Sequence, residues 1–317
     1  MTIRQWARLY GPLTAAVTLY LIFAPIALVA VPLAGLLVLS PPRSLREALI
    51  AAVAGGFGLA WLARSGSLPD QLLRSGTVIA ATVFVVSARY TTTAVTHRAL
   101  LAVATASAAA GGILLALGSS WAELHWWVAH RVSYFVSQAM GLFWQSGGAK
   151  SSPGGPTAAE LATWADSSVR LMADYYPAIL ALAVMGGLGV ATAIYHRVAV
   201  RPLGTAVGRF REFRFSEHLG WVAVVPLIIV LIPRFAAGRL SAINLLVVTG
   251  TLYALRGVAV IVFALQLLGG ASGLVTVLLA LAAILLLPIA AGGAILLGVV
   301  DAGFDLRRRW TTPPVST

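Results

Sequence analysis

An arginine lies near the middle of an apolar stretch that is long enough to cross a membrane. The stretch covers residues 240–268, which as a helix would extend roughly 40 Å and place Arg256 inside the ~30 Å hydrocarbon layer. A charge at that depth costs at least about 2.5–3.5 kcal/mol, so Arg256 needs a partner. Tyr253 and Thr249 share its helical face, whereas Asn244 lies on another face. This pattern predicts a polar network or a contact to a polar solute.

Two interpretations of Arg256 follow from the sequence. In the first, Arg256 donates hydrogen bonds to backbone carbonyls or to Asp301 and fixes helix packing, and in the second it contacts a substrate or a partner. Asp301 and Asp305 precede an arginine triplet that begins at Arg307, and pairing within this tail at the membrane surface would contribute only about 0–1 kcal/mol. The candidate substrate or polar-network residues are Arg256, Tyr253, Thr249 and Asn244, and the tail motif comprises Asp301, Asp305 and Arg307.

The other residue types that carry chemistry form no recognisable catalytic or metal site. His125 and His130, with Glu123 nearby, could ligate a metal, but their five-residue spacing places the two imidazoles about 140° apart on a helix. The absence of cysteine excludes a disulfide framework, an iron–sulfur centre and a Cys-ligated zinc site. The pair Gly111-Gly112 and similar pairs match no nucleotide-binding loop and are interpreted as helix-packing glycines. We therefore expect no enzyme activity, cofactor or metal.

Composition places the chain in a membrane. Of its 317 residues, 59% are hydrophobic and 10% are charged, whereas about a quarter of the residues of a soluble protein are charged. Much of the net charge of +12 flanks apolar runs, which favours positive-inside anchoring over nucleic-acid binding. The expected partners are the lipid bilayer and, at basic cytoplasmic loops, anionic lipid.

The apolar runs predict an all-α, polytopic transmembrane helix bundle that forms a single domain over residues 1–317. About eight spans are expected, over residues 12–24, 26–39, 45–63, 75–88, 99–117, 177–195, 240–268 and 274–300. Pro25 and Pro32 interrupt the first apolar stretch, which is expected to form a two-helix hairpin. Residues 220–232 are apolar but short and are expected to be re-entrant or interfacial. In the alternative topology they cross fully and nine spans result.

A long, less apolar segment, residues 118–175, is predicted to be a helical insertion. Aromatic residues recur at helical spacing over residues 121–144, which predicts an interfacial amphipathic helix. Residues 146–156 form a flexible Gly/Ser/Pro break. Thr157 and Glu160 then fit a capping box that opens a second helix.

The distribution of charge predicts the topology. Residues 196–217 carry five arginines against two acids and are expected in the cytoplasm, whereas residues 118–175 carry four acids against three basic residues and are expected to be extracytoplasmic. With residues 220–232 re-entrant, both termini are cytoplasmic. The predicted location is the bacterial cytoplasmic (inner) membrane.

A pattern in the last third of the chain resembles a known family. Its residues are Asn244, Leu252, Tyr253, Arg256, Gly257 and a D-x-x-F-D-x-R tail over Asp301, Phe304, Asp305 and Arg307. On these residues the chain resembles the YybS-like family of uncharacterised polytopic bacterial membrane proteins, a domain of unknown function. The resemblance covers residues 176–309 and extends to the N-terminal spans only by hydropathy. It implies a bacterial inner-membrane protein, and it implies a neutral glutamine in the family at the position of Arg256.

Two functions remain open at this point. The first is a small-solute binding or transport component, with a site around Arg256, Tyr253 and the proline-broken residues 221–233, because broken helices at membrane depth line cavities. The second is a non-catalytic membrane scaffold or assembly subunit, whose basic loops bind anionic lipid or a membrane-protein partner.

Overall fold

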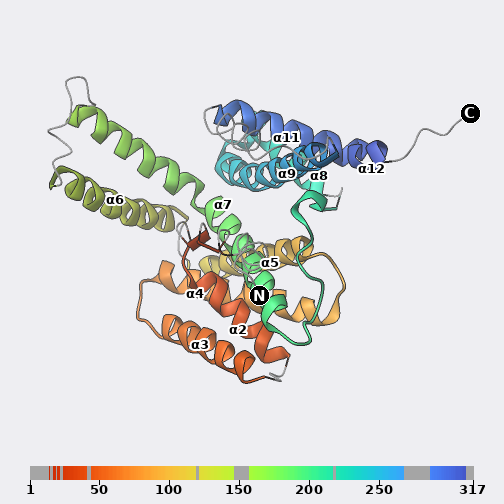
Figure 1. The fold of residues 1–317 in the computed structure, drawn as a ribbon. Coiled ribbons are helices and arrows are strands. Elements are labelled where there is room, and N and C mark those ends of the chain that lie inside the picture. The colour runs from red at the N-terminus through yellow and green to blue at the C-terminus, as the bar shows by residue number, and fades with distance from the viewer. Residues whose placement is uncertain are drawn as a thin grey trace, which may run out of the picture. The chain divides into compact units, whose positions relative to one another are not determined.

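The computed structural model describes residues 14, 17, 18, 20, 21, 24–40, 44–118, 121–145, 157–216, 219–267 and 286–311. Throughout these residues the regular secondary structure is helical (Figure 1). The all-α prediction is therefore confirmed for the described chain. Two compact units are present, Met1–Thr205 (unit 1) and Ala206–Thr317 (unit 2), and each is described by itself.

Each of the two units consists of helices that are consecutive in the chain. Unit 1 contains α2 (Ala27–Leu39), α3 (Leu45–Leu62), α4 (Leu68–Tyr90), α5 (Val95–Ala116), α6 (Trp121–Gln145) and α7 (Ala158–Val198). Unit 2 contains η2 (Phe210–Glu212), α8 (Leu219–Leu231), η3 (Pro233–Gly238), α9 (Arg239–Leu267), α11 (Leu287–Phe304) and α12 (Leu306–Thr311).

Six described helices are long and apolar enough to cross a membrane: α3, α4, α5, α7, α9 and α11. Helix α2 has 13 residues and spans roughly 20 Å, which is short of the ~30 Å hydrocarbon layer. Helix α8 is equally short and contains Pro226. The multi-pass architecture is thus supported, whereas the count of eight spans and the side of each loop stay predictions. The predicted first span, residues 12–24, lies largely outside the described residues.

Several helices differ from their predicted bounds. Helix α4 begins at Leu68 and not at residue 75, because Ser67 and Asp70 cap it and Pro69 lies in its first turn. The two helices predicted before and after residue 176 are one helix, α7, which runs through Pro177 for 41 residues. A proline removes one hydrogen bond, and neighbouring helices in a membrane protein compensate for that loss.

The last predicted span, residues 274–300, is described only from residue 286 onward. Helix α11 starts at Leu287 with Pro288 in its first turn and ends at Phe304. Residues 274–285, like the predicted flexible break at 146–156, lie outside the described residues.

Helix α6 and the first part of α7 form a helical hairpin (Figure 1). The predicted helix over residues 121–144 matches α6, and Thr157 and Glu160 form the expected capping box at the start of α7. His125 Nε2 lies 2.9 Å from Asp174 Oδ1 and connects the two helices. The position of this hairpin at an extracytoplasmic membrane surface stays a prediction.

The core of unit 1 surrounds α2, which packs against α3, α4 and α7. Phe84 and Tyr195 are fully buried there. Gly187 permits close packing, because a Cβ atom at this position would lie 2.6 Å from the carbonyl oxygen of Leu28. By contrast, a Cβ atom at Gly111 or Gly112 would meet no atom within 4 Å. Among the described residues, that glycine pair therefore makes no close packing contact, and its predicted packing role stays a prediction.

Unit 2 is built on α9, which contacts α8, α11, α12, η2 and η3. The backbones of α9 and α11 touch at two glycines. A Cβ atom on Gly257 would overlap the carbonyl oxygen of Ala294, and one on Gly298 would overlap that of Tyr253. This close approach brings Arg256 of α9 against the C-terminal end of α11.

Candidate functional site

Three charged side chains form a buried ionic cluster in unit 2. Arg256 comes from α9, Asp301 from the last turn of α11 and Arg307 from α12, and their side chains are 4%, 0% and 3% exposed. Asp301 Oδ2 accepts from Arg256 Nε at 2.8 Å and from Arg307 Nη2 at 2.7 Å. One carboxylate therefore serves two guanidinium groups, and the cluster carries a net charge of +1.

Arg307 Nε also donates to Asp301 Oδ1 at 3.4 Å, and further donors of the cluster bind backbone oxygen atoms. Arg256 Nη2 donates to the carbonyl of Asp301 at 3.0 Å, and Arg256 Nη1 donates to that of Phe215 at 3.4 Å. Arg307 Nη1 and Nη2 donate to the carbonyls of Arg211 and Phe213 at 2.9 and 3.1 Å. The cluster thus fixes the segment that leads into α8.

An aromatic contact completes the surroundings of Arg256. Its Cζ lies 5.3 Å from the centre of the Phe215 ring, and that ring packs edge-on against Tyr253 at 5.1 Å between centroids. All three nitrogens of the Arg256 guanidinium donate to protein oxygen atoms. This geometry favours the structural interpretation of Arg256 over a contact with substrate.

The other residues predicted for the polar network are also buried, but they bond within their own helix. Thr249 Oγ1 donates to the carbonyl of Leu245 at 2.9 Å, and Asn244 Nδ2 donates to that of Leu240 at 3.0 Å. Along α9, Asn244 lies roughly 18 Å from Arg256. The structure therefore brings Tyr253 close to Arg256 and leaves Thr249 and Asn244 away from the ionic cluster.

Asp305 has a different partner from the one expected. It ends α11 in a left-handed conformation with φ of 46°, and Arg214 Nη2 lies 2.9 Å from its Oδ1. The predicted pairing of Asp305 with the arginine triplet is replaced by this pair, because the left-handed turn directs Arg307 toward Asp301. Both side chains of the Arg214–Asp305 pair are partly exposed, so it contributes only about 0–1 kcal/mol.

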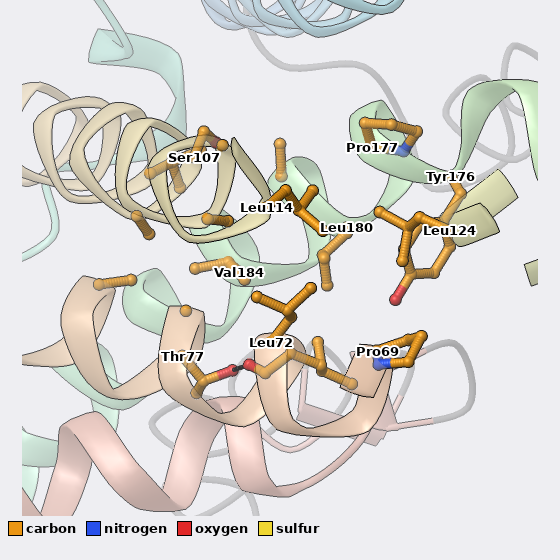
Figure 2. A pocket seen from close by; sticks show the side chains of 18 of the residues that line it. Pro69, Leu72, Thr77, Ser107, Leu114, Leu124, Tyr176, Pro177, Leu180 and Val184 are labelled. Atoms are coloured by element: carbon orange, nitrogen blue, oxygen red, sulfur yellow. Dashed lines mark hydrogen bonds between the residues drawn. The ribbon is translucent and has the colours of Figure 1, made fainter. Parts of the chain in front are cut away.

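Unit 1 contains an apolar cavity of about 460 Å³, here called the inner cavity (Figure 2). It lies between α4, α5 and α7, with Leu124 of α6 at one end. Leu72, Leu114, Leu180 and Val184 line it together with Tyr176 (Figure 2).

Small residues on α4 and α5 create this space. Gly76 and Gly111 line the inner cavity, and a Cβ atom at either position would meet no atom within 4 Å. The hydroxyl of Thr77 is satisfied within its own helix, since Oγ1 donates to the carbonyl of Leu73 at 2.7 Å. The wall therefore offers mainly apolar contacts to a ligand.

A family model described as "Predicted membrane protein (DUF2232)" matches residues 12–302. The chain belongs to this family. Neither the curated proteins nor the solved structures contain a match. The predicted membership of a family of membrane proteins of unknown function is thus confirmed, and it extends over the N-terminal helices, where the resemblance rested on hydropathy alone. The YybS-like name stays a prediction.

Two buried charged residues of this DUF2232 protein were not predicted from the sequence. Arg98 is 1% exposed, and its Nη2 donates to the carbonyl and the hydroxyl of Thr205 at 3.2 and 3.1 Å. Glu47 is 4% exposed and accepts from the backbone N–H of Val200. Both side chains therefore bind the segment that follows α7. The prediction started the helix of α5 at residue 99, which placed Arg98 in a loop, whereas α5 begins at Val95.

Proposed function

We propose that this DUF2232 protein binds a small, predominantly apolar solute in the inner cavity, as a binding or transport component of the membrane. The cavity itself is the observation that supports this function. Its volume of about 460 Å³ lies within the range of ligand pockets, roughly 300–1,000 Å³. Its walls are apolar with a few polar groups, among them the phenol of Tyr176, which is also typical of such pockets.

The proposed site differs from the one suggested by the sequence. Arg256 belongs to unit 2, and its guanidinium nitrogens already donate to Asp301 and to backbone carbonyls. We assign to the ionic cluster the role of joining α9, α11 and α12 to the segment before α8. Solute binding is assigned to the inner cavity, where two glycines leave space that a ligand can fill.

Filling the inner cavity with a side chain is expected to abolish binding. In Gly111→Leu the new side chain projects into open space, so the protein folds while about tenfold or more of the affinity for an apolar probe is lost. N-phenylnaphthylamine fluorescence, titrated with protein in nanodiscs, measures this affinity. The matched control is Gly112→Leu, which adds the same side chain one residue away, outside the cavity lining.

Both substitutions replace glycine by a better helix former, so thermal stability should stay equal or rise. Gly76→Leu approaches the same space from α4 and is expected to repeat the effect. Equal, saturable binding by the wild type, Gly111→Leu and Gly112→Leu would overturn the proposal, as would a wild type that fails to bind the probe.

A second candidate function, recognition of anionic lipid, is supported by the surface of unit 2. Arg308 and Arg309 are exposed on α12, and the exposed aromatic side chains Phe304 and Trp310 lie beside them. Arg309 Cζ lies 5.7 Å from the Phe304 ring. Arginine next to exposed aromatic residues suits a membrane interface with negatively charged headgroups.

Neutralising this surface is expected to reduce anionic lipid retention. The double variant Arg308→Gln/Arg309→Gln should lose about 1 kcal/mol per arginine, which is about fivefold for each. Mass spectrometry of the purified protein measures the ratio of retained phosphatidylglycerol to phosphatidylethanolamine. The control, Arg131→Gln/Arg170→Gln, removes the same charge from exposed positions of the hairpin. An equal change in both double variants would show that only net charge matters.

A further inference from the structure

The inner cavity has a polar group at one end. Tyr176 of α7 lines this cavity, and its hydroxyl points toward Pro69 and Leu124 (Figure 2). Pro69 and Leu124 also line a second space of about 500 Å³, here called the outer cavity, which Trp126 and Trp127 border. Tyr176 therefore marks the end of the inner cavity that meets the outer cavity.

The hydroxyl of Tyr176 is available to a ligand. Within the part of the chain that the structure describes, this hydroxyl takes part in no hydrogen bond. Other hydroxyls of unit 1 are satisfied by the protein. Tyr195 Oη donates to Ser40 Oγ at 2.9 Å, and Thr77 Oγ1 donates to the carbonyl of Leu73 at 2.7 Å. Because an unpaired donor in apolar surroundings costs free energy, a hydrogen-bond acceptor on a ligand would stabilise the complex with Tyr176.

The charges around the two cavities favour a neutral ligand. Every residue that lines the inner cavity is uncharged, so a charge placed there would be buried without a partner. At the outer cavity the charges have opposite signs, since Glu123 lines it and Arg131 Cζ lies 5.7 Å from the Trp127 ring. Each of these charges repels the head group that the other attracts. Neither a cationic nor an anionic head group is therefore favoured.

The wall that extends from Tyr176 into the inner cavity is apolar. Leu180 and Val184 follow Tyr176 at four-residue spacing, so the three side chains lie along one face of α7 over roughly 12 Å. Gly76 and Gly111 leave open space on the walls that α4 and α5 provide. An apolar body of about this length, with its polar group at the Tyr176 end, matches the cavity.

We infer that the inner cavity binds a neutral, elongated apolar molecule with one hydrogen-bond acceptor, such as a ketone or ester carbonyl, at the end that contacts Tyr176. This inference rests on the proposed function, since it names the class of solute. The Tyr176 hydroxyl donates to the acceptor, and the apolar part lies along Leu180 and Val184. Tyr176 thus distinguishes such a molecule from a hydrocarbon of the same shape.

A pair of probes that differ in one oxygen atom tests this hydrogen bond. In 4-isopropenylbiphenyl a CH₂ group replaces the carbonyl oxygen of 4-acetylbiphenyl, and each probe displaces N-phenylnaphthylamine from the protein in nanodiscs. Tyr176→Phe is expected to weaken binding of the ketone about threefold to tenfold, the range of one hydrogen bond, and to leave binding of the hydrocarbon unchanged. Comparing two probes in two proteins cancels the partition of each probe into the lipid.

Two further variants show whether the effect belongs to Tyr176. Tyr175→Phe is the matched control, because it removes the same hydroxyl one residue away, outside the cavity lining, and should leave both affinities unchanged. Ser107→Ala removes another hydroxyl from the wall of the cavity. A loss of ketone affinity that is as large in Tyr175→Phe, or larger in Ser107→Ala, would overturn the assignment.

Infrared spectroscopy observes the hydrogen bond without a comparison of affinities. A ¹³C label in the carbonyl group of 4-acetylbiphenyl separates its stretching band from the lipid esters. The band of the bound ketone is expected at lower wavenumber in the wild type than in Tyr176→Phe, whereas Tyr175→Phe should keep the wild-type position. Gly111→Leu, which fills the cavity, gives the band of the ketone in lipid. A wild-type band at the position found in Gly111→Leu would refute the hydrogen bond, even if Tyr176→Phe did not fold.

The proposed function and this inference fail in different ways. If Gly111→Leu abolishes N-phenylnaphthylamine binding, but Tyr176→Phe affects the two biphenyls equally or not at all, the hydrogen bond is refuted and the apolar solute site stands. If neither N-phenylnaphthylamine nor the biphenyls bind the wild type saturably, both the solute site and the role of Tyr176 are refuted.

Discussion

Replacing Asp301 by asparagine is expected to lower the free energy of unfolding of unit 2 by about 3–5 kcal/mol, the usual cost of removing one partner from a buried ion pair. Two buried guanidinium groups share this carboxylate, at 2.8 and 2.7 Å. Asparagine retains one side-chain oxygen, and its amide N–H groups would face the donors of Arg256 and Arg307. Chaotrope titration of the purified protein, followed by limited proteolysis of unit 2, measures the loss.

Two further variants separate the ionic cluster from a general effect of charge. Asp305→Asn is the matched control, because its pair with Arg214 is partly exposed and should contribute about 0–1 kcal/mol. Arg256→Leu should cost less than Asp301→Asn, since Asp301 keeps Arg307 as a partner and no acid is stranded. Equal losses in Asp301→Asn and Asp305→Asn would contradict the assigned role of the cluster.

The partner of Arg256 could be predicted because a charge inside an apolar stretch must be compensated. That requirement pointed to Asp301 as one alternative. Pairing of Asp301 with the arginine triplet was also predicted, at the membrane surface, and the structure shows it for Arg307 in a buried position. Which of the three consecutive arginines pairs, and its burial, could not be predicted. The selection depends on the left-handed turn at Asp305, which ends α11 and directs the first arginine of α12 inward.

The inner cavity could not be predicted from the sequence, because small residues can have two opposite effects in a membrane helix. They permit close packing where another backbone approaches, and they leave space where none does. The sequence of Gly111-Gly112 resembles that of Gly186-Gly187, yet among the described residues the second pair has neighbours at its missing Cβ positions and the first has none within 4 Å. The position of the facing helix decides whether a small residue permits close packing or leaves space. The local sequence does not contain that position.

Apolar runs, by contrast, located most helices within a few residues. The expected segment over residues 45–63 matches α3, and that over residues 240–268 matches α9. Errors arose where helical periodicity continues across a change in composition, as in α7 at Pro177. A hydropathy pattern detects the environment of a helix better than its ends, which depend on caps.

Gly298→Val is expected to give the largest loss among single substitutions in unit 2. A Cβ atom at Gly298 would overlap the backbone carbonyl oxygen of Tyr253, and a rigid backbone contact cannot be relieved by a rotamer change. Helices α9 and α11 must then separate, which also pulls Asp301 away from Arg256. Even Gly298→Ala should cost about 1–3 kcal/mol or more, and the valine variant should fail to yield folded protein.

Membrane yield, monodispersity on size exclusion and thermal unfolding measure this effect. Gly293→Ala is the control in the same helix, because its Cβ atom would meet no atom within 4 Å. It should be neutral or gain up to about 1 kcal/mol from the better helix former. Gly257→Ala tests the contact from α9, where the overlap is with the carbonyl oxygen of Ala294. If Gly298→Ala and Gly257→Ala are as stable as Gly293→Ala, the backbone contact between α9 and α11 is refuted, and with it the approach that pairs Arg256 with Asp301.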